Sequence, residues 1–427
     1  MRILLAIFDA DTHFYNTVNL AWAFRAAGHE VYVAGPPQME RHVVASGLPH
    51  VPIGLEQDMM ADVRTYPYDQ LAHGTKWDIR EEDPEVLNAE FARRALGVWY
   101  SDYSLGYMGH EEAVRDIADF ARSWKPDVVL WDTISLVGQV ASQVANALSV
   151  RILFGRDQFV RMANVIADAG EWDDYDNPMS KLLTKRLELV GEEYDPRLMF
   201  GDVTIDSNPS FSYDAWDLRR QRMRYLPYNG PSVVPDWLKV PAERPRVAFT
   251  IGLSLRQVDD DRFTLVSATV KLPELMEALG EVDAEVVATL DEDQITRVAT
   301  IPDNVRIVGF VPLAPLLTTC SAIVHHGGAG TRNNAFVRGV PQVISPSWAW
   351  DEDFVARNAQ RLGAGIMVDP DNLKPADVRD SVNRILSDDS FAKNAAVIQE
   401  EMLSYPTPAE VVRNLEEMVV EHRDTRG

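Results

Sequence analysis

One stretch of the sequence combines histidines, glycines and a threonine in a pattern suited to holding phosphate. An apolar strand pattern begins at Ile323 and runs through His325 into a glycine-rich turn that ends at Thr331, and a helical pattern follows from Asn333 to Arg338. Glycines let the backbone approach a ligand closely, and a helix start aims unsatisfied amides at whatever lies in the turn. His325 and Thr331 can each add a hydrogen bond to a phosphate oxygen. We expect a diphosphate site here, with a turn that needs glycine for packing alone as the alternative.

A second histidine, His13, lies in the polar turn that we expect after the first strand. At the mouth of a sheet, a histidine can take a proton from an acceptor hydroxyl near neutral pH. Asp132 ends another expected strand of the same sheet, and its carboxylate could orient the ring and stabilise its charged form. Two structural alternatives stay open: Asp132 could cap the helix that begins near Leu136, and His13 could be a surface or capping residue.

Two adjacent acids, Asp351 and Glu352, precede an expected helix from Phe354 to Leu362. Acids at a helix start can simply complement its dipole. In a loop after a strand, they also suit hydrogen bonding to sugar hydroxyls. Adjacent residues cannot flank a bond as the paired carboxylates of a glycoside hydrolase do. We therefore expect Asp351 and Glu352 to bind a sugar.

These positions lie within repeated strand–helix–strand patterns, which predict parallel sheets. In the first half we expect a strand over 2–8, a turn over 9–16, a helix over 18–28, a strand over 30–34, and later a strand over 126–131, a helix over 136–148 and a strand over 152–154. In the second half we expect strands over 247–251, 285–289, 305–308, 322–324 and 342–344, with a helix over 272–279. The fold class is thus α/β, with two Rossmann-like domains, and open parallel sheets bind ligands beyond the carboxyl ends of their strands.

A proline-rich passage from Tyr225 to Pro245 separates the two halves and suits a linker. We predict an N-terminal acceptor-binding domain over 1–220, a linker over 221–243, and a C-terminal nucleotide-sugar domain over 244–405. Residues 406–427 are expected to form a helix that packs back on the N-terminal domain.

The stretch from Glu56 to Tyr107 is rich in tryptophan, tyrosine and acids and has no clean periodicity. We interpret it as an insertion of loops and helices over the first sheet, where aromatic rings could line a pocket for a hydrophobic ligand. A plain core role for the same rings remains an equal alternative. The candidate acceptor-binding residues are Phe14, Trp77, Trp99, Tyr100 and Tyr103.

Composition narrows the classes of partner. The chain has 427 residues, which suits two domains, and its formal net charge of −24 disfavours nucleic acid and anionic membranes. No segment is long and apolar enough to cross a bilayer, so we expect a cytoplasmic protein. The single cysteine, Cys320, excludes an internal disulfide, and no cluster of ligands predicts a metal site.

Taken together, these residues resemble the bacterial natural-product glycosyltransferases of the GT-B superfamily, in which two Rossmann-like domains face each other across a cleft. The subgroup that attaches deoxysugars to macrolides and related polyketides is the most similar. The resemblance covers essentially the whole chain. It is carried by His13 with the segment 20–31, by the segment 223–231, by His325 through Thr331, and by the segment 339–342.

The resemblance implies a role for each matching position. His13 matches the catalytic base, and Asp132 matches the acid that orients it. The positions that hold the donor are Gly252, Ser254, Phe310, Val311, Pro312, His325, His326, Gly327, Gly328, Ala329, Gly330, Thr331, Asp351 and Glu352. Glu352 stands where members usually carry glutamine, which removes a hydrogen-bond donor and adds charge.

The reaction that the resemblance implies is inverting, metal-independent transfer of a deoxysugar from a dTDP-sugar to a polyketide-type acceptor in antibiotic biosynthesis. No tightly bound cofactor is expected. The expected partners are the aglycone, the nucleotide sugar and a cytochrome-P450-like activator protein, and a homodimer stays open. Two alternatives remain, namely a nucleotide-sugar 2-epimerase of the same fold and an auxiliary protein that binds a nucleotide sugar without catalysis.

Overall fold

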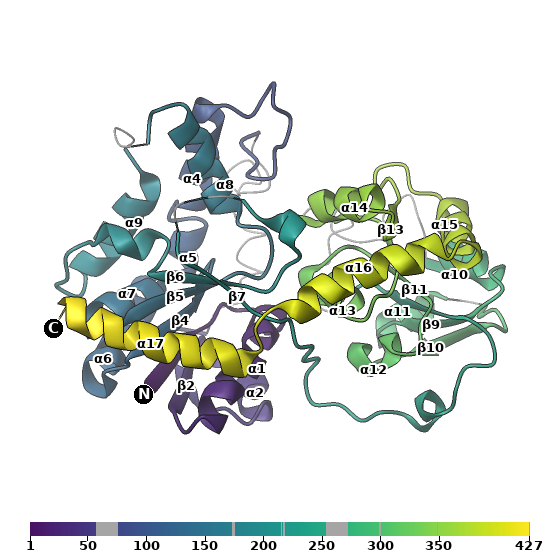
Figure 1. Ribbon diagram of the computed structural model, residues 1–427, viewed down its shortest axis with the longest axis horizontal. Helices are drawn as coiled ribbons and strands as arrows, with labels where there is room; N and C mark the ends of the chain where they lie inside the picture. Colours follow the sequence, from purple (N-terminus) through teal and green to yellow (C-terminus); the bar gives the residue numbers. More distant parts are fainter. Residues whose placement is uncertain are drawn as a thin grey trace. The chain divides into compact units, whose positions relative to one another are not determined.

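The protein folds as two compact units (Figure 1). The computed structural model describes residues 1–56, 76–172, 176–214, 216, 218–252, 272–298, 300–347 and 349–426. Unit 1 comprises Met1–Asn208, Ser212–Arg224 and Tyr405–Gly427, and unit 2 comprises Pro209–Phe211 and Tyr225–Ser404. The chain therefore passes between the units four times, and the C-terminal segment returns to the unit in which the chain began.

Unit 1 is built on a seven-stranded sheet with the order β3-β2-β1-β4-β5-β6-β7. All its paired strands are parallel. The strands are β1 Arg2–Ala6, β2 Glu30–Gly35, β3 His50–Pro52, β4 Val128–Asp132, β5 Leu148–Ile152, β6 Val203–Asp206 and β7 Arg220–Arg222. Every residue of β4 and β5 is buried, as expected for a parallel sheet covered on both faces.

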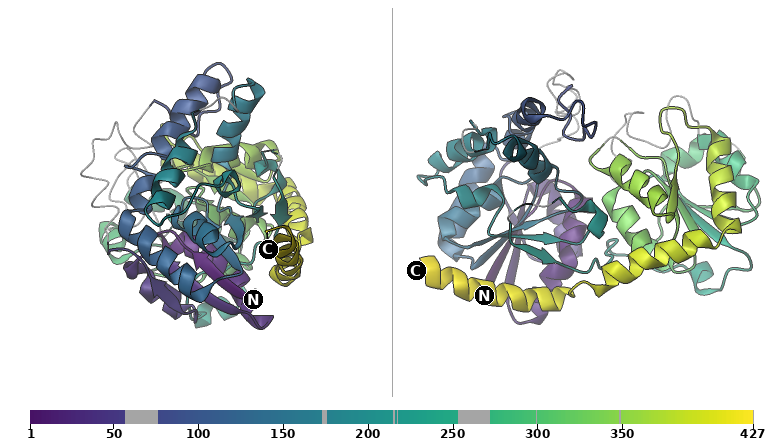
Figure 2. Two further views of the ribbon diagram at one scale, coloured as in Figure 1. Left: turned by 90° about the vertical axis from the view of Figure 1, so that its left-hand side faces the viewer. Right: turned by 45° about the horizontal axis from the view of Figure 1, so that its top comes forward.

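The helices of unit 1 connect and cover these strands. They are α1 Asp11–Ala26, α2 Glu40–Ala45, α4 Ala89–Trp99, α5 Leu105–Met108, α6 Glu111–Trp124, α7 Val137–Ala145, α8 Gln158–Asp168, α9 Pro178–Glu188 and α17 Pro408–Arg426. Of the expected insertion over 56–107, residues 57–75 lie outside the described residues. The C-terminal helix α17 packs against α1 and β5, and Figure 2 shows it running along unit 1.

Several boundaries in unit 1 differ from the sequence prediction, and the largest differences are at the start of α1 and the start of β5. Helix α1 begins at Asp11 rather than after Asn16, so the polar residues at its start form its first turn, where Asp11 complements the dipole. Helix α7 ends at Ala145, its C-cap Asn146 adopts a left-handed conformation with φ of 48°, and β5 begins at Leu148 rather than Ile152. Asparagine tolerates this conformation better than most residues, which explains why the helix stops there.

Unit 2 is built on a six-stranded parallel sheet with the order β10-β9-β8-β11-β12-β13. Its strands are β8 Arg246–Thr250, β9 Glu285–Thr289, β10 Val305–Val308, β11 Ala322–His325, β12 Gln342–Ile344 and β13 Gly365–Met367. Its helices are α10 Leu272–Gly280, α11 Glu292–Arg297, α12 Leu313–Leu317, α13 Ala329–Phe336, α14 Glu352–Arg361, α15 Pro375–Ser387 and α16 Ser390–Ser404.

Alternate residues of β8 belong to two different cores of unit 2. Val247 and Phe249 pack with α10 and α15, whereas Ala248 packs with α12 and α13. Both faces of the sheet are thus covered by helices, as Figure 1 also shows. This arrangement leaves the strand ends and their loops as the places where unit 2 can bind a ligand.

Within the described part of the chain, no helix is long and apolar enough to cross a membrane.

Candidate functional site

The strand order in unit 1 reverses between β1 and β4. Strands β2 and β3 follow β1 on one side, and β5, β6 and β7 follow β4 on the other. In open parallel sheets, ligands bind beyond the carboxyl ends of the strands at such a switch point. His13 lies in the first turn of α1, directly after β1, and Asp132 is the last residue of β4. The topology therefore brings both residues to the switch point.

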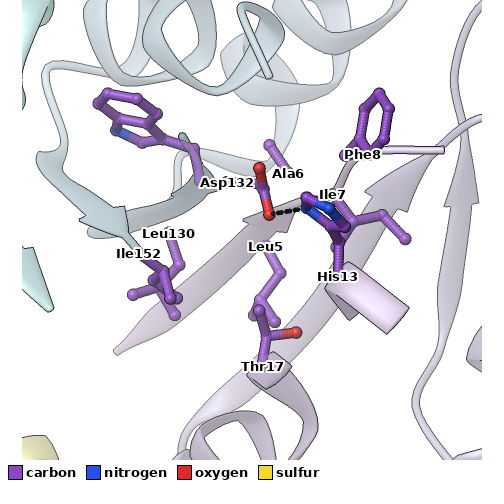
Figure 3. Close-up of a pocket in the computed structure, with 10 residues that line it drawn as sticks. Leu5, Ala6, Ile7, Phe8, His13, Thr17, Leu130, Asp132 and Ile152 are labelled. Carbon is purple, nitrogen blue, oxygen red and sulfur yellow. Dashed lines mark hydrogen bonds and ion pairs between the residues drawn. The ribbon is translucent and has the colours of Figure 1, made fainter. Parts of the chain in front are cut away.

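The ring of His13 and the carboxylate of Asp132 face each other (Figure 3). Nδ1 of His13 lies 2.9 Å from Oδ2 of Asp132, and Oδ1 of Asp132 accepts a hydrogen bond from the amide of Ile134. Asp132 thus bonds to the histidine and to the turn that follows β4. It does not cap α7, because the N-cap of that helix is Leu136 and its first amides receive no side-chain cap, so the cap alternative is wrong. With Nδ1 donating to Asp132, the neutral ring presents the lone pair of Nε2, which has no partner among the described residues.

The strand order in unit 2 reverses between β8 and β11, which gives a second switch point. Gly252 follows β8, and the glycine-rich turn follows β11. Gly252 and Gly327 have φ of +85° and +95°, a conformation that other residues adopt at a cost. Helix α13 then begins with Gly328 as its N-cap, which has no side chain to cap the first amides. Those amides are free to bind an anion.

The two histidines of this turn have different surroundings. His325 is fully buried, its Nδ1 accepts a hydrogen bond from the amide of Gly327, and its Nε2 lies 2.8 Å from Oε1 of Gln342. Burial lowers the pKa of His325 to about 3, so the ring is neutral. Because both ring nitrogens are already bonded within the protein, the geometry does not support the expected phosphate contact from the His325 side chain.

His326, unlike His325, has a ring nitrogen that is not hydrogen-bonded within the described residues. Its Nδ1 has no hydrogen-bond partner among the described residues, and burial lowers its pKa to about 4. A Cβ atom on Gly252 would lie 2.2 Å from Cε1 of His326, and one on Gly328 would lie 2.4 Å from its Nε2. The ring is therefore held between the two loops at the switch point, and only glycine leaves room for it on both sides.

The acids expected to bind the sugar are both engaged inside unit 2. Asp351 forms a buried ion pair with Arg332, with 2.7 Å between Oδ2 and Nη2, and Arg332 also donates to the carbonyl of Gly327. Oε2 of Glu352 accepts a hydrogen bond from the amide of Trp350. Burial and the neighbouring Asp351 raise the pKa of Glu352. Arg332 thus ties Asp351 to the glycine-rich turn.

The other expected donor-binding residues are less uniform. The side chain of Phe310 is half exposed just beyond β10, whereas Val311 is buried in the core with α12 and α13. Pro312 is the N-cap of α12. Ser254 lies outside the described residues.

The expected acceptor residues divide between the interior and the surface of unit 1. Phe14 is fully buried, and the rings of Trp99 and Tyr100 are buried against Phe159 of α8. Phe14, Trp99 and Tyr100 are therefore core residues of unit 1 in this structure. Tyr103 has 52% of its surface exposed, which leaves its ring accessible. The partly buried ring of Trp77 packs edge-on against Phe91, with Arg94 over its face.

Among the described residues, no group of three or more histidine, cysteine, aspartate or glutamate side chains could hold a metal ion.

Comparison with known proteins identifies the family to which these sites belong. Residues 22–252 match the N-terminal domain of the erythromycin biosynthesis protein CIII-like family, and residues 273–418 match its C-terminal domain.

The chain belongs to this family of glycosyltransferases. It resembles deoxysugar transferases of macrolide and anthracycline biosynthesis along its whole length. Because the chain belongs to this family, we identify it as a glycosyltransferase and not as an epimerase or a non-catalytic binding protein.

Three relatives illustrate the match. The chain is 39% identical to aclacinomycin-T 2-deoxy-L-fucose transferase of Streptomyces galilaeus, covering 100% of this chain and 98% of that protein. It is 37% identical to 3-alpha-mycarosylerythronolide B desosaminyl transferase of Saccharopolyspora erythraea, covering all of both chains. The solved structure of the glycosyltransferase VinC in complex with dTDP is 36% identical, with a TM-score of 0.88 over 99% of this chain and 100% of that one. The fold is thus the GT-B fold that the resemblance implied.

Sequence reasoning missed three features of these glycosyltransferase sites. It did not separate the roles of His325 and His326, because burial and hydrogen bonding are not visible in the motif. It did not foresee that Arg332 would pair with Asp351, since the two residues lie on different elements. It also overlooked two phenylalanines, Phe8 and Phe154, whose rings contact His13. Each is the last residue of an expected strand, 2–8 or 152–154, and that position at a carboxyl end was the available signal.

Proposed function

We propose that this glycosyltransferase transfers a deoxysugar from a dTDP-sugar to a hydroxyl of a polyketide-type acceptor. In this mechanism Nε2 of His13 removes the hydroxyl proton, and the oxygen attacks the anomeric carbon from the face opposite the diphosphate. The bond to the diphosphate oxygen breaks as the new glycosidic bond forms, so the anomeric configuration is inverted. Relatives named for 2-deoxy-L-fucose and desosamine transfer, and the dTDP complex of VinC, support this donor class.

The observation that carries the proposal is the His13–Asp132 pair at the switch point of unit 1. Asp132 fixes the tautomer that leaves Nε2 as the proton acceptor, and its charge stabilises the imidazolium that forms. A positioned base of this kind contributes a factor of about 100 to 10,000 to the rate of a transfer reaction.

The leaving diphosphate is the second requirement of the mechanism. We assign its stabilisation to the free amides at the start of α13 and to the unpartnered ring nitrogen of His326. Hydrogen bonds from neutral groups can offset the leaving charge without a divalent cation. The sugar itself is assigned to the Asp351–Glu352 segment, in which the Arg332 pair fixes the first acid.

The acceptor and the partners are proposed more broadly. Tyr103 offers an accessible aromatic ring on unit 1 for a hydrophobic aglycone. A cytochrome-P450-like activator protein and a homodimer belong to the same proposal. Activity assays should therefore be run with and without candidate activators.

Thermal stabilisation by nucleotides tests the donor assignment directly. A ligand at 100 times its dissociation constant adds about 2.7 kcal/mol to the unfolding free energy. We expect dTDP and dTDP-sugars to raise the melting temperature more than UDP and UDP-sugars do. Stabilisation by UDP alone would exclude dTDP as the donor nucleotide. Transfer is then measured by mass spectrometry with a panel of acceptors that includes aclacinomycin T, the substrate in the name of one relative.

A further inference from the structure

Two phenylalanine rings contact His13 from neighbouring strand ends. The ring of Phe8, two residues beyond β1, lies with its centroid 5.1 Å from that of His13 at an interplanar angle of 61°. The ring of Phe154, two residues beyond β5, lies 4.2 Å away at 48°. Strands β1, β4 and β5 are adjacent in the sheet, and β4 supplies Asp132. Three neighbouring strands thus each place one side chain against the same imidazole.

Hydrogen bonds fix this arrangement from both sides. Asn16 lies three residues after His13 on α1 and therefore faces the same side of the helix. Its side-chain amide donates to the carbonyl of Leu153, 3.1 Å away, which ties α1 to the residue before Phe154. The hydroxyl of Thr133, the residue after Asp132, donates to the carbonyl of Ile152 at 2.8 Å. The end of β5 is therefore anchored both to the helix that carries the histidine and to the strand that carries the acid.

We propose that Phe8 and Phe154 are positioning residues that hold the His13 ring in the rotamer in which Nδ1 faces Asp132 and Nε2 is presented to the acceptor hydroxyl. This inference rests on the proposed role of His13 as the base. Rotation of the ring about its Cβ–Cγ bond would break the bond to Asp132 and sweep the ring against its two aromatic neighbours. A side chain locked by packing keeps its reactive atom where catalysis needs it.

The same rings also favour the product of proton transfer. When Nε2 takes the proton, the imidazole becomes a cation with two aromatic ring centroids within 6 Å of its own. Aromatic π electrons attract cations at such distances, and the apolar rings strengthen the bond to Asp132 by excluding water. Phe154 has the closer ring and is the better target for substitution.

The test compares Phe154→Leu, which removes the ring but keeps an apolar side chain, with Phe154→Tyr, which keeps the ring. We expect Phe154→Leu to lower kcat by about ten- to a hundred-fold with little change in KM for the donor, and Phe154→Tyr to retain most turnover. Phe120→Leu is the matched control. Phe120 lies on α6 of the same unit, where its ring packs against Tyr32 of β2 and Trp124 of α6 and not against His13. It should reproduce any general cost of replacing phenylalanine and leave kcat unchanged.

A double-mutant comparison separates positioning from an alternative role of Phe154 as a wall of the acceptor site. In a His13→Ala background, Phe154→Leu should change the residual turnover by less than about twofold, because the residue through which it acts is gone. A loss as large as in the wild type would assign Phe154 to acceptor binding and overturn the proposal. If His13→Ala alone retains full turnover, it is the base assignment that fails, and the ring geometry is then judged by spectroscopy.

Nitrogen-15 NMR of protein labelled at its nine histidines provides that readout without any substrate. The His13 signals are identified by their loss in His13→Ala. We expect wild-type His13 to be a single tautomer protonated at Nδ1, and Phe154→Leu to give a mixture of the two tautomers. An unchanged single tautomer in Phe154→Leu and in Phe8→Leu would overturn the proposal.

Discussion

The histidines at the two switch points are used in opposite ways. In unit 1, His13 has one ring nitrogen bonded to Asp132 and the other without a partner among the described residues. In unit 2, His325 at the end of β11 has both ring nitrogens bonded inside the protein, and its pKa is lowered to about 3 by burial. The first ring can exchange a proton, and the second holds a turn in shape.

The acids beside these histidines follow the same division. Asp132 bonds to a histidine that has 17% of its side chain exposed, whereas Asp351 is locked to Arg332 with both side chains 1% exposed. Both units have a parallel sheet with a switch point, but the groups available there differ. Unit 1 has the side chains of His13 and Asp132, whereas unit 2 has backbone amides and Nδ1 of His326. A sequence motif therefore does not show which of its polar residues contact the ligand.

The largest expected effect comes from removing the imidazole of His13, the proposed base. His13→Ala should lower turnover by about 100- to 10,000-fold, or roughly 3 to 5 kcal/mol, and leave dTDP affinity nearly unchanged, because the groups that we assign to the diphosphate lie on unit 2. Steady-state kinetics and dTDP titration measure the two effects. Asp132→Asn should give a smaller loss in the same direction. Retention of most turnover by His13→Ala would make the histidine structural and remove the contrast between the units.

The next largest effect concerns the buried ion pair of unit 2. Arg332→Met removes the positive charge that pairs with the buried carboxylate of Asp351 and should lower the free energy of unfolding by about 3 to 5 kcal/mol, as measured by urea denaturation. Arg357→Met is the matched control, because Arg357 and Asp353 form an ion pair on α14 with about half of each side chain exposed. That substitution should cost no more than about 1 kcal/mol. Equal losses for both variants would mean that burial of the Arg332 pair does not matter.

A smaller effect separates the two neighbouring histidines of unit 2. His326→Ala should weaken dTDP binding by about 1 to 3 kcal/mol, the range for a lost hydrogen bond to a charged group. His325→Gln should lower thermal stability more than dTDP affinity, because His325 bonds to Gly327 and Gln342 rather than to a ligand. Isothermal titration and melting curves on both variants test this. The reverse pattern would return the phosphate contact to His325.

The smallest expected effect is none at all. Because amides at the start of α13 and His326 are assigned to the leaving diphosphate, turnover should be unchanged by EDTA. If EDTA lowers the rate and magnesium or manganese restores it, a divalent cation also stabilises the leaving diphosphate.

The sequence predicts the features of the two sites that depend on local patterns better than those that depend on contacts between distant segments. The strands and the crossings between them follow from local apolar patterns, and the predicted strand ends place His13 and Asp132 at one edge of the sheet. The strands β3, β6, β7 and β13 were not foreseen, since they span only three or four residues and have no clean alternation. The start of α1 was placed too late because polar residues in a first helical turn look like a loop.

The details of the site depend on contacts between distant segments, which a single sequence does not report. Nothing local distinguishes His325 from His326, although their hydrogen bonds differ completely. In the same way, the aromatic residues Trp99 and Tyr100 suit either a pocket or a core, and only the packing against Phe159 shows that they are interior. Sequence therefore indicated the neighbourhood of the site, and tertiary packing decides the role of each residue within it.

The return of residues 405–427 to unit 1 has a consequence for how the protein is made. Helix α17 buries Val411, Val412 and Leu415, yet it leaves the ribosome only after all of unit 2. Translation of Tyr225–Ser404 takes about 10 to 40 seconds at ordinary elongation rates. During that time the α1 surface that α17 will cover is open to water and to chaperones. The unit that begins synthesis first is therefore the last to be completed, and an N-terminal half expressed alone would carry this surface uncovered.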